Sequence, residues 1–208
     1  MKSEDAGYYM RKPFTADDIR LLLDSFNTSR ISGLRNFAII NLMARTGIRE
    51  IEVHRANRGD IKDTDSDIQS NNGKILFYIQ RKGKRAKEDF VILTKETYAA
   101  INEYLMWRNP IEASDPLFIS HGNKKRGERL GIRTIQDMIY EQLKTTGLKK
   151  ECLSGHSIRH FFATQLIEKN VNIEKIRIAL GHKSIVTTSR YTKGIDRLSN
   201  PVEEQIEI

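Results

Sequence analysis

The chain has 208 residues, a length that suits one sizeable hydrophobic core rather than two. Lysine and arginine (35) outnumber aspartate and glutamate (27), and this net charge of +8 favours a polyanionic partner, although a merely soluble basic surface is the alternative from charge alone. The one cysteine, Cys152, excludes an intramolecular disulfide, and no apolar run approaches the ~20 residues of a membrane span, so we expect a cytosolic (cytoplasmic) protein without membrane contact.

The N-terminal part of the chain predicts a polar leader and three helices. Residues 1–12 are polar and indicate a leader or the remnant of a linker. Thr15 is followed by two aspartates, which predicts an N-cap, and Gly47 is expected to end the second helix, over residues 33–44. A third, short helix is expected over residues 50–56. The apolar residues at helical spacing, expected in the core, are Ile19, Leu22, Leu23, Phe26, Leu34, Phe37, Ala38, Ile40, Met43, Ile51 and Val53.

The middle of the chain predicts a β-hairpin, and the rest predicts helices. Residues 74–80 and 89–93 are β-prone runs on either side of a basic turn, residues 81–87. Helices are expected over residues 95–108, 132–146, 157–169, 173–180 and 185–191, with Asn172 and Ser184 as N-caps of the last two. The predicted fold class is therefore mainly α with a small antiparallel β-sheet (α+β).

The last quarter of the chain carries the most informative chemistry. It contains His156-Ser-Ile-Arg159-His160, then Leu180-Gly-His182, then Tyr191. A tyrosine hydroxyl with arginine and imidazole partners, but no carboxylate cage for a metal, suits attack on a phosphodiester. A zinc site at His156 and His160 is the alternative, but zinc takes three or four ligands and no cysteine or acidic cluster accompanies them. We therefore expect no metal, and we interpret His160 as a structural histidine.

Two further stretches admit both an ordinary and a functional interpretation. Arg49, in Thr46-Gly-Ile-Arg49-Glu-Ile-Glu52, is either a surface arginine paired with Glu52 or an anion-binding group at a helix N-terminus. The second stretch, Arg81-Lys82-Gly83-Lys84, belongs to the basic turn, and basic turns are usually just solvated. The cations that we expect to contact the DNA backbone without sequence preference are Lys84, Arg85, Lys87, Lys124, Lys125 and Arg126, joined by Arg129 and Arg133.

Taken in chain order, Arg49, Lys82, His156-x-x-Arg159, Leu180-Gly-His182 and Tyr191 resemble the catalytic residues of the tyrosine recombinases (phage-integrase family) over about residues 13–192. The resemblance implies a tyrosine-recombinase catalytic-domain fold. In it Arg49 and Arg159 would clamp the phosphate, Glu52 would orient Arg49, and His182 would hold a phosphate oxygen. His156 would assist proton removal from Tyr191, the nucleophile.

The resemblance leaves two candidates for the general acid. The family's hairpin string is Gly-Lys-Gly, and here Arg81 stands in place of the first glycine. That departure leaves Lys82 and Lys84 as alternatives for the lysine that protonates the leaving 5′-oxygen. Lys82 is preferred because it directly precedes Gly83.

The resemblance also implies the reaction and the partners. Tyr191 would cut one strand of double-stranded DNA to form a 3′-phosphotyrosyl linkage, and strand exchange would pass through a Holliday junction without any cofactor. The implied assembly is a homotetramer on two duplexes in the bacterial nucleoid, with accessory DNA-bending or directionality proteins as further candidate partners. The rival functions are type IB topoisomerase-like DNA relaxation and non-catalytic DNA binding as an accessory protein.

Both ends of the chain carry expectations of their own. The family's N-terminal clamp domain is missing, so an isolated catalytic domain is expected. Residues 193–208 form an acidic tail with Val202, Ile206 and Ile208. By resemblance this tail docks on a neighbouring subunit, and an unstructured terminus is the alternative.

Overall fold

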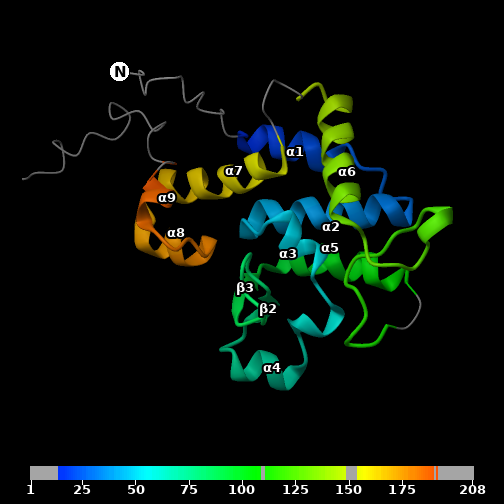
Figure 1. Cartoon of the computed structure of the whole chain (residues 1–208), viewed down its shortest axis with the longest axis horizontal. Helices are drawn as coiled ribbons and strands as arrows, with labels where there is room; N and C mark the ends of the chain where they lie inside the picture. The colour runs from blue at the N-terminus through cyan, green and yellow to red at the C-terminus, as the bar shows by residue number, and fades with distance from the viewer. Residues whose placement is uncertain (1–13, 109–110, 149–153, 190, 192–208) are drawn as a thin grey trace, which may run out of the picture.

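The computed structural model describes residues 14–108, 111–148, 154–189 and 191, and it is mostly helical with one small sheet (Figure 1). The expected fold class, mainly α with a small antiparallel sheet, is confirmed. None of the helices within these described residues is both long and apolar enough to span a bilayer. In chain order the elements are α1 (Ala16–Asp24), α2 (Ile31–Thr46), α3 (Glu50–His54), η1 (Arg58–Asp60), β1 (Ile61–Lys62), α4 (Asp65–Ser70), β2 (Ile75–Ile79), β3 (Asp89–Leu93), α5 (Lys95–Met106), η2 (Asn123–Lys125), α6 (Ile132–Thr145), α7 (Gly155–Glu168), α8 (Ile173–Leu180) and α9 (Ile185–Ser189).

Helix α2 forms the centre of the main core. Its side chains are buried on nearly every face, which is the pattern of a helix enclosed by other elements rather than of a surface helix. In Figure 1 it crosses the middle of the molecule, and it packs against α1, α5, α7 and β3. Gly47 ends it in the left-handed conformation, with φ of 66°, as the sequence predicts. The residues that follow α2 are thereby anchored to the most buried helix of the chain.

The three-stranded sheet has the order β1-β2-β3, and both pairs are antiparallel. Phe77 pairs with Ile61 on one side and with Val91 on the other, and all three side chains are buried in the core. The opposite face of the hairpin carries Tyr78 beside Phe90, whose rings lie 5.9 Å apart. The sheet therefore lays one face on the helices and projects its β2–β3 turn from one end.

The C-terminal helices form a second, smaller hydrophobic cluster. Ala163 of α7, Ile176 and Leu180 of α8, and Tyr191 are its buried members. Asn172 caps α8 by accepting a hydrogen bond from the backbone N–H of Glu174, which confirms the predicted cap. The segment that carries Tyr191 thus rests on α7 and α8.

Several expected details are wrong. Helix α2 begins two residues earlier than predicted, at Ile31, and α9 ends at Ser189 rather than at residue 191. Leu23 and Phe37 lie at the edge of the core, only partly buried, and Ile51 is also partly exposed. Strand β1 and helix α4 were not anticipated, because two residues are too few to show an alternating pattern and α4 has no buried side chain to mark its inner face.

Substituting Gly47 tests how closely α2 and the C-terminal helices approach. A Cβ at this position would lie 2.5 Å from a ring carbon of Phe162, whereas a Cβ at Gly73, which also has a positive φ, would meet nothing within 4 Å. Gly73→Ala should cost about 1–2 kcal/mol for the left-handed backbone. Gly47→Ala should cost about 1–3 kcal/mol more, because the core must make room. Urea unfolding of both variants measures the difference, and equal losses would contradict the close approach.

Candidate active site

Arg49 lies in the turn between α2 and α3 and is held by a carboxylate in the same turn. Glu52 accepts hydrogen bonds from the Arg49 backbone N–H (2.8 Å) and from its Nη1 (3.1 Å). The Glu52 side chain is fully buried, while that of Arg49 keeps 26% of its surface exposed. One carboxylate therefore caps the first turn of α3 and orients the guanidinium, with part of that group left open to a ligand.

Arg159 of α7 is almost completely buried and joins the ends of two other helices, α2 and α8. Its terminal nitrogens donate to the carbonyls of Gly47 and Leu180, both at 2.5 Å, and its Nε has no hydrogen-bond partner. Burial lowers the pKa of Arg159 to about 10, and the nearby charge of Arg49 acts in the same direction. The group remains a cation at neutral pH, and it brings the Arg49 turn and the Leu180-Gly-His182 turn together.

Tyr191 packs between two histidine rings. The ring of His160 meets it edge-on at 4.7 Å, and the ring of His182 stacks on it at 5.9 Å. The side chain is 7% exposed. His160, interpreted from the sequence as structural, does make a structural contact, but the partner is the tyrosine that the sequence marks as the nucleophile.

His182 is a neutral imidazole in this arrangement. Its Nδ1 lies 2.9 Å from the hydroxyl of Thr188, which is fully buried. Burial lowers the pKa of His182 to about 4, and the positive charges of Arg159 and Arg49 contribute in the same sense. If the Thr188 hydroxyl donates to Nδ1, Nε2 carries the proton and can donate to a phosphate oxygen.

The hairpin turn places Arg81 and Lys82 on opposite sides. The backbone N–H of Lys84 donates to the carbonyl of Arg81 at 3.0 Å, and Gly83 takes a φ of 82°, as a turn with glycine at its third position requires. Lys82 is exposed at the tip. Lys84 is also exposed, with its Nζ 3.9 Å from Glu88. The side chain of Arg81, in contrast, points into the protein and is 7% exposed.

His156 lies on the first turn of α7 and is exposed, whereas Arg159 of the same helix is buried. Gly155 before it allows α7 to approach α3, because a Cβ there would lie 2.2 Å from a carboxylate oxygen of Glu50.

Within residues 14–108, 111–148 and 154–189, no group of three or more His, Cys, Asp or Glu side chains is placed to hold a metal ion.

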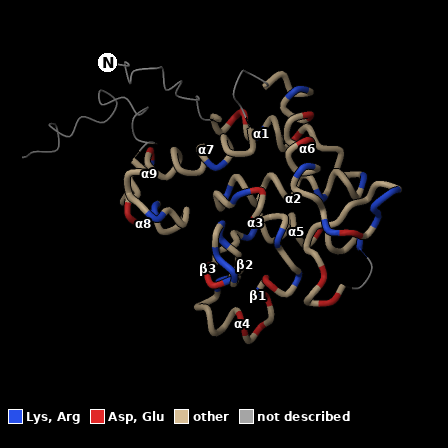
Figure 2. Tube along the Cα trace, viewed as in Figure 1, with Lys and Arg blue, Asp and Glu red and all other residues tan. Residues whose placement is uncertain are grey.

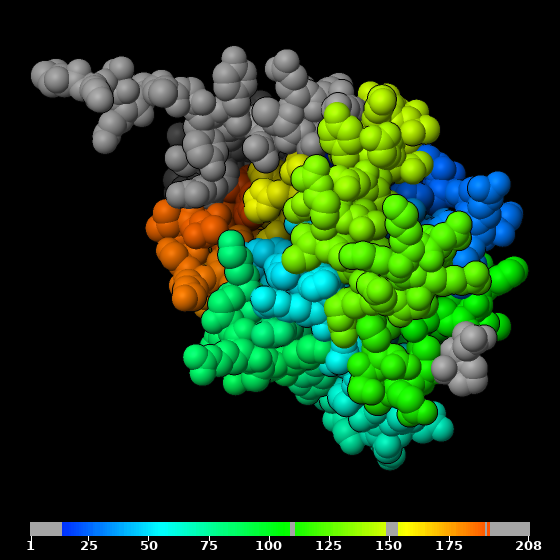
Figure 3. Space-filling view, turned by 45° about the vertical axis from the view of Figure 1, so that its right-hand side comes forward, coloured from blue at the N-terminus to red at the C-terminus, as the bar shows by residue number. Residues whose placement is uncertain are grey.

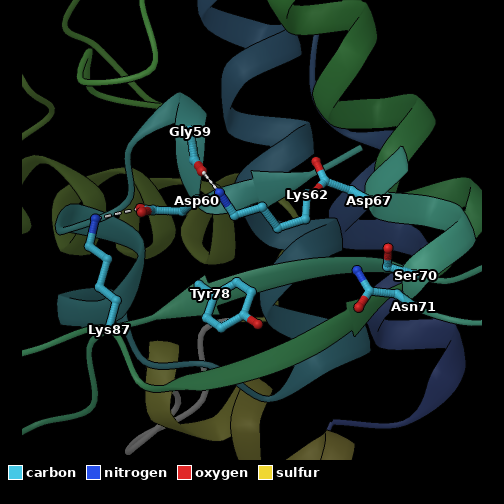
Figure 4. Close-up of a pocket in the computed structure, with 8 residues that line it drawn as sticks. All are labelled: Gly59, Asp60, Lys62, Asp67, Ser70, Asn71, Tyr78 and Lys87. Carbon is cyan, nitrogen blue, oxygen red and sulfur yellow. Dashed lines mark hydrogen bonds and ion pairs between the residues drawn. The ribbon is translucent and has the colours of Figure 1, made fainter. Parts of the chain in front are cut away.

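Two groups of the basic residues expected to contact DNA lie in separate places. Lys87 makes an ion pair with Asp60 in a shallow pocket between β1, β2 and α4 (Figure 4). The loop that carries Lys124, Lys125 and Arg126 lies at the far side of the molecule from the β2–β3 turn (Figure 2). Their contact with DNA stays a prediction, as it does for Arg85.

Sequence reasoning missed two residues at the site. Thr188 fixes the His182 ring through a hydroxyl that carries no motif of its own. Arg81 was noted only as a departure from the family's glycine, yet its Nη1 lies 3.5 Å from Glu52. The arginine in place of the family's glycine could have indicated this contact, because a long cationic side chain at a tight turn must either extend into solvent or pair with an anion.

The burial of His182 predicts a loss of stability in acid. An unfolded histidine takes up a proton near pH 6.5, whereas the folded His182 resists protonation until about pH 4. Between these values the unfolded chain binds more protons, so the free energy of unfolding should fall as pH drops through that window. His182→Gln should lose less stability than the parent between pH 7 and pH 5 in urea unfolding. Parallel losses in both proteins would contradict the lowered pKa.

The chain is similar to one family of proteins over most of its length. Residues 12–196 match the model of the phage integrase family. Proteins named tyrosine recombinase XerC are similar, from Chlamydia trachomatis (29% identity, 93% of this chain and 57% of the relative) and Syntrophus aciditrophicus (30%, 88% and 57%). The crystal structure of XerA recombinase superposes with a TM-score of 0.71 at 27% identity, over 99% of this chain and 66% of that one.

A post-cleavage complex of the XerH site-specific recombinase with a palindromic difH substrate shares the fold, with a TM-score of 0.76 at 22% identity over 97% of this chain and 55% of that one. The chain spans just over half the length of the curated relatives that it matches. The family model nevertheless covers nearly all of it, and every residue of the site described above falls inside the match. The chain belongs to the phage integrase family.

Proposed function

We propose that this chain is the catalytic part of a site-specific DNA recombinase (integrase) that cuts and rejoins strands through a 3′-phosphotyrosyl intermediate. The observation that carries the proposal is a local excess of positive charge beside a tyrosine. Arg49 and Arg81 both lie against Glu52, which is fully buried, and Arg159 lies close enough to Arg49 and Arg81 for their charges to lower its pKa. Cations in excess of buried carboxylates suit a phosphate, and guanidinium groups bind its oxygens in pairs.

In the proposed reaction the Tyr191 oxygen attacks the phosphorus of the scissile phosphodiester. A bond forms between this oxygen and phosphorus while the bond from phosphorus to the 5′-oxygen breaks. The tyrosine proton passes to His156, and Lys82 gives a proton to the departing 5′-oxygen. Arg49, Arg159 and His182 stabilise the charge on the non-bridging oxygens. Attack by a 5′-hydroxyl of the partner duplex reverses the step and exchanges strands through a Holliday junction.

The relatives support this proposal by their names, and XerH supports it by its DNA complexes. The proposed partner is therefore double-stranded DNA, and the proposed assembly is a homotetramer on two duplexes in the bacterial nucleoid. The proposed domain spans residues 13–192. The tail, residues 193–208, lies outside the described residues, so its docking on a neighbouring subunit stays a prediction. DNA relaxation and inert DNA binding are separated from recombination by the experiments below.

Covalent trapping tests the nucleophile. The protein is incubated with a pool of nicked duplexes of randomised sequence, and DNA is recovered from SDS-resistant adducts to give a defined substrate. Tyr191→Phe removes only the hydroxyl, so it should bind this substrate and form no adduct. Tyr140→Phe, on the exposed face of α6, should form the adduct at the parent rate.

An adduct that persists in Tyr191→Phe would show that another residue is the nucleophile. A parent protein that binds the pool without any adduct would favour the accessory-protein alternative. A parent that relaxes supercoiled plasmid but never joins strands between two duplexes would favour the topoisomerase-like alternative.

Substrate chemistry separates Lys82 from Lys84 as the general acid. Lys82→Ala should slow cleavage by about 10²–10⁴-fold. Sulfur in place of the bridging 5′-oxygen should restore most of that rate, because a thiolate scarcely needs a proton to leave. The same DNA should not rescue Arg49→Ala, whose defect would lie in phosphate stabilisation. If the sulfur rescues Lys84→Ala while Lys82→Ala cuts ordinary DNA at full rate, the role belongs to Lys84.

A further inference from the structure

Arg81 is the buried end of an otherwise exposed turn. Its side chain is 7% exposed, whereas Lys82, Gly83, Lys84, Arg85 and Ala86 are all exposed. A Cβ on Gly83 would meet nothing within 4 Å, and the Gln80 side chain bonds only to carbonyls within the turn itself. Among the described hydrogen bonds and ion pairs made by the side chains of residues 81–87, those that reach beyond the hairpin are made by Arg81 and by Lys87 with Asp60.

The guanidinium of Arg81 reaches two separate parts of the proposed site. Its Nη2 donates to the carbonyl of Ala179 in the last turn of α8 at 2.8 Å. Its Nη1 lies 3.5 Å from the carboxylate of Glu52, which also holds Arg49. Figure 3 shows the hairpin, in green, rising between α3, in cyan, and the C-terminal helices, in orange. A side chain from the hairpin thus spans the space between them.

The contact with α8 is close. A Cβ on Gly181 would lie 2.6 Å from the Nε of Arg81, so the guanidinium packs directly beneath the residue that precedes His182. The Nε also lies 3.6 Å from the carboxylate of Asp89, at the start of β3. Two of these contacts reach the proposed catalytic groups, since Glu52 holds Arg49 and Gly181 directly precedes His182.

We propose that Arg81 is a positioning residue, which ties the β2–β3 turn to Glu52 and to the C-terminal end of α8. It thereby sets the position of Lys82 relative to Arg49 and His182. Arg81 and Lys82 are adjacent on opposite sides of a tight turn, so a shift of the buried side chain shifts the exposed one. The inference rests on the proposed function and deepens it. It assigns to this chain a link that a glycine at the same position could not make.

Single-turnover cleavage of the selected nicked duplex tests the proposal. Arg81→Met keeps the length of the side chain and removes its charge and its donors, and Lys74→Met removes one exposed charge from the far end of β2 as the matched control. A misplaced catalytic group costs up to about 10²-fold in rate, so Arg81→Met should cut about 10–10²-fold more slowly. Lys74→Met should cut at the parent rate.

The bridging-sulfur substrate identifies what Arg81 acts through. If Arg81 places Lys82, the sulfur should restore most of the rate of Arg81→Met, as is expected for Lys82→Ala. A parent rate in Arg81→Met, or a slow rate that sulfur does not rescue, would overturn the proposal. Arg81→Lys keeps the charge but has one head group for three contacts, so it should fall between the parent and Arg81→Met.

Hydrogen exchange tests the same link without any catalysis. In the free protein, amides of residues 79–88 should exchange faster in Arg81→Met, and in Arg81→Lys to a lesser degree, than in the parent and Lys74→Met. Unchanged exchange in both Arg81 variants would overturn the proposal. A parent that forms no adduct would refute the recombinase function, and the exchange result would still decide the role of Arg81.

Discussion

The site depends on one buried cation that holds the ends of two helices. Helices α2 and α8 both end in a glycine with a left-handed backbone, and each end presents a carbonyl to Arg159. A helix C-terminus carries partial negative charge and unpaired carbonyls, which a cation stabilises. Burying a guanidinium is costly unless its donors are bonded, so Arg159 and the two helix ends require one another. Because Arg49 follows Gly47 by two residues and His182 follows Leu180 by two, this contact also gathers the proposed catalytic groups.

The net charge of the site depends on the burial of its side chains as well as on their types. Glu52 is the buried carboxylate among Arg49, Arg81 and Arg159, and it cannot neutralise all three. Loss of water on burial, and then the same positive surroundings, lower the pKa of His182 to about 4, so the imidazole adds a hydrogen-bond donor rather than another charge. A site of this kind attracts an anion through its arginines and orients it through neutral groups.

The proposed nucleophile and the arginine proposed to bind the phosphate rest on different parts of the molecule. Arg49 follows α2, the centre of the main core, whereas Tyr191 belongs to the small cluster of Ala163, Ile176 and Leu180. Few buried side chains hold that cluster together, and regions with few buried contacts open at lower free energy than a large core. Besides the packing of α7 on α2, contacts of Arg159 and Arg81 cross between the two parts and help to set the distance between the tyrosine and the cations.

The sequence by itself determined the features that depend on local interactions. The sequence predicts the helices from the spacing of apolar residues, the caps at Thr15 and Asn172, and the glycine that ends α2. Each of these features depends on a few neighbouring residues. Leu23 and Phe37 were placed too deep, and β1 and α4 were missed, because spacing says which face is apolar but not how much covers it. Only the tertiary structure decided that Arg159 bonds to Gly47 and Leu180, that His160 packs on Tyr191, and that Arg81 lies against Glu52. Each of these contacts joins residues at least twenty positions apart, so its existence depends on packing that no local pattern records.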